Sequence, residues 1–111
     1  MARDTFYAKR GDRNPPLRAT LIGADKAVAN LTGITSVYFH MKDTSTGVVK
    51  VNAAASVVDA VTGSVKYEWG ATDLDTAGTY FGEFEVIDGN GFPTSFPNND
   101  YFIVQVAEDI V

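Results

Sequence analysis

The residues that could carry chemistry are few and scattered. His40 is the only histidine of the 111-residue chain, and a general base or metal ligand needs a nucleophile, a carboxylate or further ligands within reach. The alternation of residue types around it points His40 away from Phe39 and Met41, which favours a surface or interface position. The sequence has no Gly-x-Ser-x-Gly turn and no Gly-x-x-x-x-Gly-Lys loop. We therefore predict no catalytic residues.

Three loop aspartates offer a possible metal site. Asp73, Asp75 and Asp88 could meet at one end of a β-sandwich and bind calcium, a hard cation that takes six or more oxygen ligands. Their spacing is not that of a calcium-binding loop, and loop aspartates usually serve turns. We therefore expect no metal and no cofactor.

Two shorter charged patterns favour surface roles. Glu83 and Glu85 share one strand face, and Lys66 could pair with them across the strands, so a salt-bridged surface is favoured over a glycosidase-like acid pair. Arg10-Gly11-Asp12 has the form of an integrin-binding tripeptide. Its position beside a predicted turn makes a turn the favoured interpretation.

Composition excludes several classes of protein. The chain has 9 Lys and Arg against 14 Asp and Glu, a net charge of −5, which argues against binding nucleic acid or an anionic membrane. It contains no cysteine, which excludes a disulfide framework, thiolate zinc sites and cysteine catalysis. No apolar run approaches the length of about 20 residues that spans a membrane, and residues 1–13 lack the apolar stretch of a signal peptide.

The elements that must position these residues are strands. Apolar and polar residues alternate with period two, and Gly-, Pro- and Asn-rich turn signals separate the runs. The clearest runs are Leu17–Leu21, Val37–Lys42, Val48–Val51, Ser56–Asp59, Val65–Trp69, Tyr80–Ile87 and Phe102–Val106. They predict a single all-β domain over residues 14–111. Residues 1–13 are either its first strand or an N-terminal arm that adds a strand to a neighbour's sheet.

One local pattern is more specific. Asp75–Tyr80 has the form Asp-x-Ala-Gly-x-Tyr at the start of a strand. In immunoglobulin-like sandwiches a tyrosine at this corner bonds its hydroxyl to backbone a few residues upstream. We therefore predict an immunoglobulin-like antiparallel β-sandwich of about seven to eight strands. Asp75, Gly78 and Tyr80 would form its corner, and Trp69 would be a core aromatic.

The chain carries more aromatic residues than a thin domain buries, and exposed aromatics mark protein interfaces more often than cofactor pockets. The interface candidates are Phe6, Tyr7, Tyr38, Phe92, Phe96 and Tyr101. A carbohydrate-binding module stays open as an alternative, because sugar faces stack on aromatic rings. It would require Tyr38, Trp69 and Phe92 to be exposed and roughly coplanar, and a buried Trp69 would count against it.

The order and spacing of several stretches match a known family. They are Pro15–Leu21, Asn30–Gly33, Val37–Met41, Val57–Trp69, Asp73–Tyr80, Glu83–Val86, Thr94–Asn98 and Tyr101–Val104. With them the chain resembles the N-terminal domain family of phage baseplate upper proteins and related small phage tail proteins, from about residue 11 to residue 107. In that family the domain is usually followed by a stalk and receptor-binding regions. This sequence ends a few residues after its last predicted strand, so we expect it to carry no receptor-binding head, unless a separate chain provides one.

The resemblance implies a non-enzymatic structural protein of a phage virion, made in the host cytoplasm. It would be a tail, baseplate or neck module for assembly and attachment, working through protein–protein contacts in a symmetric particle. The implied partners are other virion proteins, including further copies of the chain, with neither nucleic acid nor membrane. A capsid decoration protein and a module that binds a host-surface glycan remain the alternatives. The family brings no catalytic residues.

Overall fold

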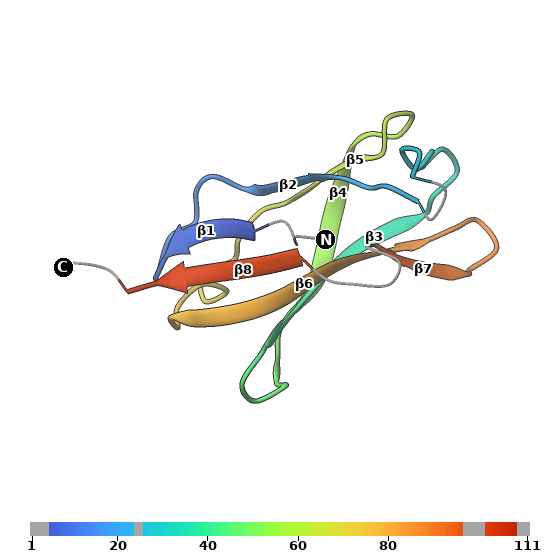
Figure 1. Cartoon of the computed structure of the whole chain (residues 1–111). Helices are drawn as coiled ribbons and strands as arrows, with labels where there is room; N and C mark the ends of the chain where they lie inside the picture. The colour runs from blue at the N-terminus through green and yellow to red at the C-terminus, as the bar shows by residue number, and fades with distance from the viewer. Residues whose placement is uncertain (1–4, 24–25, 97–101, 109–111) are drawn as a thin grey trace.

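The computed structural model describes residues 5–23, 26–96 and 102–108, and its regular elements are all β-strands (Figure 1). The strands in chain order are β1 (Thr5–Lys9), β2 (Leu17–Thr20), β3 (Ser36–Asp43), β4 (Val49–Asp59), β5 (Ser64–Tyr67), β6 (Gly78–Ile87), β7 (Pro93–Phe96) and β8 (Phe102–Ala107). The all-β prediction is confirmed.

Strand β4 joins the two layers of the fold. Its first half, up to Ala55, pairs with β3, and its second half, from Ser56, pairs with β5. One layer therefore runs β1-β8-β6-β3-β4, and the other runs β4-β5-β2. β7 and β8 lie end to end along the same edge of β6. The result is a mixed sheet that is nearly closed like a barrel, and its strand order is compatible with an immunoglobulin-like sandwich.

The first strand departs from the antiparallel prediction. β1 runs parallel to β8, with Phe6 opposite Val104, whereas the other described strand pairs are antiparallel. Alternation along Thr5–Lys9 fixes which side chains face the core, but it does not fix the ladder partner or its direction. The purely antiparallel arrangement is therefore wrong at this edge.

Two strand boundaries also differ from the expected runs. Val49–Val51 and Ser56–Asp59 belong to one continuous strand, β4, because Asn52–Ala55 connects them. Val48 lies just before this strand. Alanines carry little hydrophobic alternation, so the run has no clear period in the sequence. β7 was not among the expected strands. It begins at Pro93 and pairs only with β6 in the described sheet, an edge position at which proline costs no ladder hydrogen bond.

The core lies between the layers and is rich in aromatic rings. Phe39 is fully buried, and the centroid of its ring lies 4.8 to 5.9 Å from those of Tyr67, Trp69, Phe84 and Phe102. On β6 the alternation is regular, with every second residue from Tyr80 to Val86 buried and the residues between them partly exposed. The partly exposed residues of β6 form the outer face of this layer.

Candidate interaction surfaces

The corner before β6 has the geometry expected of Asp75–Tyr80. The Tyr80 side chain is 1% exposed, and its hydroxyl donates a hydrogen bond to the carbonyl oxygen of Thr76 over 2.7 Å. Gly78 lies against the Tyr80 ring, since a Cβ there would lie 3.7 Å from the ring. Burial raises the pKa of Tyr80 above its ordinary value. A neutral hydroxyl therefore holds the loop to the start of β6.

Asp75 belongs to the same corner but makes a charged contact. Its carboxylate accepts a hydrogen bond from the Lys50 ammonium on β4 and another from the Thr76 hydroxyl. These hydrogen bonds, that of Lys50 first, lower the pKa of Asp75 below its ordinary value of 3.8. The corner is thereby tied to β4, the strand that joins the two layers, as well as to β6.

Trp69 is a core residue, only 3% exposed. Its ring lies 5.5 Å from that of Phe6, which is half-buried on β1. Tyr7, the next residue, points outward and is 76% exposed. Of the two β1 aromatics, Tyr7 alone presents its ring to a partner, while Phe6 helps to hold β1 on the domain.

The other interface candidates fall in different environments. Phe92 is 66% exposed in the β6–β7 hairpin, and Tyr38 is half-buried on the outer face of β3. Phe96 is only 7% exposed and packs in the core, because the antiparallel register of β7 sets it directly opposite Phe84. The interface role expected of Phe96 is therefore not supported by its position. Tyr101 lies outside the described residues.

The three loop aspartates do not converge on a metal site. Asp73 accepts hydrogen bonds from the Tyr67 hydroxyl and the Gly70 amide, Asp75 accepts from Lys50, and Asp88 accepts from backbone amides of its own hairpin. Burial and then the neighbouring Asp73 raise the pKa of Tyr67. Within the described residues, no three His, Cys, Asp or Glu side chains are grouped to hold a metal ion.

The Arg10-Gly11-Asp12 segment is a turn that closes β1. The Arg10 guanidinium lies 3.1 Å from the Glu108 carboxylate, and Gly11 has a φ of +86°. The Asp12 carboxylate accepts the backbone N–H of Lys9 over 3.2 Å. Each of the three residues therefore has a local structural role.

The outer face of the β3–β6 pair holds the predicted charged residues. His40 Nδ1 lies 3.4 Å from Glu83 Oε1, and Glu85 lies one cross-strand row away. Lys66 does not join them, because β5 and β6 are not neighbours in the sheet. Its ammonium lies 3.9 Å from Glu68 instead. The expected pairing of Lys66 with Glu83 and Glu85 is wrong.

Sequence analysis missed a cluster of exposed aliphatic residues, which we call the valine tip. Its members lie in the β4–β5 hairpin and in the neighbouring loop after β2, and they are 39 to 65% exposed. They are Ile22, Val28, Val57, Val58 and Val61. The two segments are joined by a hydrogen bond from the Leu21 amide to the Gly63 carbonyl over 2.8 Å, and they lie together at the top of Figure 1. The signal in the sequence is the consecutive pair Val57 and Val58 on β4, because strict alternation along a strand would bury one of the two.

The described residues include no helix with the length and apolar character needed to cross a bilayer. Residues 3–104 match the family model described as the BppU N-terminal domain. A search of curated proteins gave no match.

Among solved structures, the chain is similar to the crystal structure of CopC from Methylosinus trichosporium OB3b, with a TM-score of 0.55 and 12% sequence identity. That alignment covers 100% of this chain and 89% of CopC. At this identity the likeness concerns the fold alone.

Proposed function

The chain belongs to the BppU N-terminal domain family, which makes it a phage baseplate structural protein, and we propose that it acts there as a non-enzymatic assembly module. It is made in the host cytoplasm and incorporated into the virion. It works through protein–protein contacts with other virion proteins and with further copies of itself, and it supports the parts of the particle that attach to the host.

The valine tip is the observation that carries this proposal beyond the family. Val61 is 65% exposed and Val58 is 51% exposed, although both are aliphatic. Exposed aliphatic residues that gather at one end of a domain are typical of a protein–protein contact. Tyr7 and Phe92, which are also exposed, offer secondary contacts of the kind that interfaces favour.

Two arrangements of side chains that would have indicated a different role do not form. The aromatic platform of Tyr38, Trp69 and Phe92 does not form, because Trp69 is buried. A hydrolase would need acidic residues that converge, whereas Asp73, Asp75 and Asp88 are engaged in separate contacts. Both observations favour a structural role.

The assembly role is tested by sedimentation of the full chain, alone and co-expressed with the other baseplate proteins. We expect concentration-dependent assembly that the double substitution Val58→Asp and Val61→Asp weakens at least tenfold. Val48→Asp is the matched control, because Val48 is 64% exposed in the β3–β4 hairpin at the other end of β4. A wild-type chain that stays monomeric and binds no baseplate protein would contradict the proposal, and equal loss in Val48→Asp would contradict the valine tip as the contact.

A further inference from the structure

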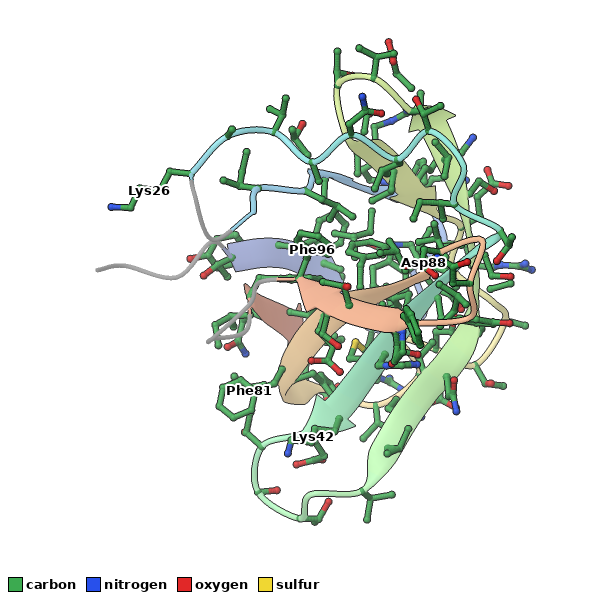
Figure 2. All side chains as sticks on the ribbon, turned by 90° about the vertical axis from the view of Figure 1, so that its right-hand side faces the viewer. Lys26, Lys42, Phe81, Asp88 and Phe96 are labelled. Atoms are coloured by element: carbon green, nitrogen blue, oxygen red, sulfur yellow. The ribbon has the colours of Figure 1, made fainter. Side chains whose placement is uncertain are left out.

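The loop between β6 and β7 contains the one Asn-Gly pair of the chain, Asn90-Gly91. Asp88, labelled in Figure 2, begins this loop, and its backbone N–H donates to the Phe92 carbonyl oxygen over 3.1 Å. The Gly91 N–H donates to the Asp88 carbonyl oxygen over 3.0 Å, and Gly91 has a φ of +82°. The hairpin therefore closes with a left-handed residue, a position that favours glycine.

The side-chain amide of Asn90 is accessible and unengaged. The residue is exposed, and its side chain makes no hydrogen bond with the residues that the structure describes. A Cβ at Gly91 would have no atom within 4 Å. Neither a side chain on the next residue nor packing around it therefore shields the Asn90 amide from the Gly91 nitrogen.

We propose that Asn90 is a site of spontaneous deamidation, asparagine being one of the thermolabile residues. The Gly91 backbone nitrogen attacks the Asn90 side-chain carbonyl carbon, and the new C–N bond closes a succinimide ring. The bond from that carbon to the side-chain nitrogen breaks, the proton of the attacking nitrogen is transferred to the leaving nitrogen, and ammonia departs. Water then opens the ring at either carbonyl, which leaves aspartate or isoaspartate at this position.

The hydrogen bonds of Asp88 restrain this reaction. Its carboxylate accepts the backbone N–H of Asn90 over 2.9 Å and that of Phe92 over 3.0 Å. The Gly91 nitrogen must leave the Asp88 carbonyl oxygen before it can attack, so the turn has to open first. Asp88 also precedes a glycine, but its own carboxylate is held by these two amides, so Asn90 is the residue that reacts.

The reaction changes the charge of an exposed loop. Each conversion replaces a neutral amide with a carboxylate and takes the net charge of the chain from −5 to −6. The new charge lies two residues from Phe92, which is 66% exposed. The loop then carries two carboxylates instead of that of Asp88 alone. The site is separate from the valine tip and goes beyond the assembly role.

The test incubates the full chain in mildly alkaline buffer, which favours loss of the proton from the attacking nitrogen. Peptide mass spectrometry with fragmentation then locates each conversion. We expect Asn90 to react at least about tenfold faster than Asn30 and Asn52, which precede leucine and alanine. Asp88→Ala should speed the reaction about twofold to tenfold, the effect of losing one ordinary hydrogen bond.

Thr94→Ala is the matched control, because it truncates an exposed residue of β7 outside the loop, and it should leave the rate unchanged. Asn90→Gln should abolish the conversion at this position, since its longer side chain would have to close a larger ring. Conversion at Asn90 no faster than at Asn30 or Asn52, or a rate in Asp88→Ala no higher than in Thr94→Ala, would overturn the proposal. Sedimentation of the Val58→Asp and Val61→Asp variant reports on assembly alone, so the two proposals fail separately.

Discussion

The Tyr80 hydroxyl makes one hydrogen bond that a single substitution removes. Its bond to the Thr76 carbonyl is 2.7 Å long, and the ring is buried. We predict that Tyr80→Phe lowers the free energy of unfolding by about 1 kcal/mol, measured by urea unfolding with the fluorescence of Trp69, the single tryptophan. Tyr7→Phe, at an exposed tyrosine of β1, should stay within about 0.5 kcal/mol of the wild type. Equal stability of all three proteins would refute a stabilising corner.

Asp75 gives the stability of the domain a dependence on acid pH. Its pKa is lowered in the folded state, chiefly by the Lys50 hydrogen bond. The contribution is therefore complete above the ordinary value of 3.8 and is lost as the pH falls below it. We predict that the unfolding free energy of Asp75→Asn falls less steeply below about pH 4 than that of the wild type.

The matched control for this pH effect removes the partner. Lys50→Met should flatten the same part of the curve, because it removes the main cause of the lowered pKa. Asp43, whose pKa is lowered by its hydrogen bonds with Ser45, remains in both variants. The free energy of unfolding of each variant should therefore still decrease somewhat as the pH falls. Parallel curves for wild type and Asp75→Asn would show that the pair does not form in solution.

Residue-scale prediction from sequence succeeded where the pattern was local. The Asp75–Tyr80 motif predicts a contact between residues four apart, Tyr80 and Thr76, and the structure contains that hydrogen bond. Phe96 and Lys66 show the limit. Whether Phe96 is covered depends on β6 beside it, and the neighbours of Lys66 depend on strand order. Neither the burial of Phe96 nor the neighbours of Lys66 can be predicted from the residues adjacent to them in the sequence.

The β4–β5 turn depends on Gly63. Its φ is +72°, and a Cβ there would lie 2.6 Å from the Ala29 carbonyl oxygen, a backbone atom of the neighbouring loop. Gly47 has nearly the same φ, +74°, with no atom within 4 Å of such a Cβ. Gly47→Ala should therefore cost only the penalty of the left-handed conformation, about 1 to 2 kcal/mol.

We predict that Gly63→Ala destabilises the domain by about 2 kcal/mol more than Gly47→Ala, measured by urea unfolding. The added cost arises because the Ala29 backbone must move, and with it the loop that carries Ile22 and Val28 of the valine tip. Equal stability of the two variants would mean that the loop and the turn do not pack as the structure has them.

Strand partners could not be predicted from the alternation in β1. Phe6 and Tyr7 predict opposite faces, and the structure places them so, with Phe6 on Trp69 and Tyr7 outward. Pairing with β8 in the parallel direction depends on a contact across almost a hundred residues. The cross-strand row of Asn52, His40 and Glu83 could not be predicted for the same reason, because these residues meet only through the register of three strands.

At the scale of the whole molecule, β4 separates the valine tip from the β3–β4 hairpin. Val58 and Val49 lie nine residues apart on one strand, so they are up to about 30 Å apart at the usual rise per residue. A contact at the valine tip therefore lies at the opposite end of β4 from Val48, the control position. A module of this kind can be held in the particle at one end while its outer sheet face stays accessible.

The net charge of −5 sets how salt acts on assembly. Copies that meet through the aliphatic valine tip gain no ion pairs there, while their like charges repel at a distance. Salt shortens the range of this repulsion from about 30 Å at 0.01 M to about 10 Å at 0.1 M. We predict that self-association, measured by sedimentation velocity, strengthens as NaCl is raised through this range and then levels off. Val58→Asp with Val61→Asp should stay weakly associated throughout. Association that weakens steadily with added salt would mean that ion pairs hold the copies together, and the contact would then have to be sought among the charged residues of the outer face.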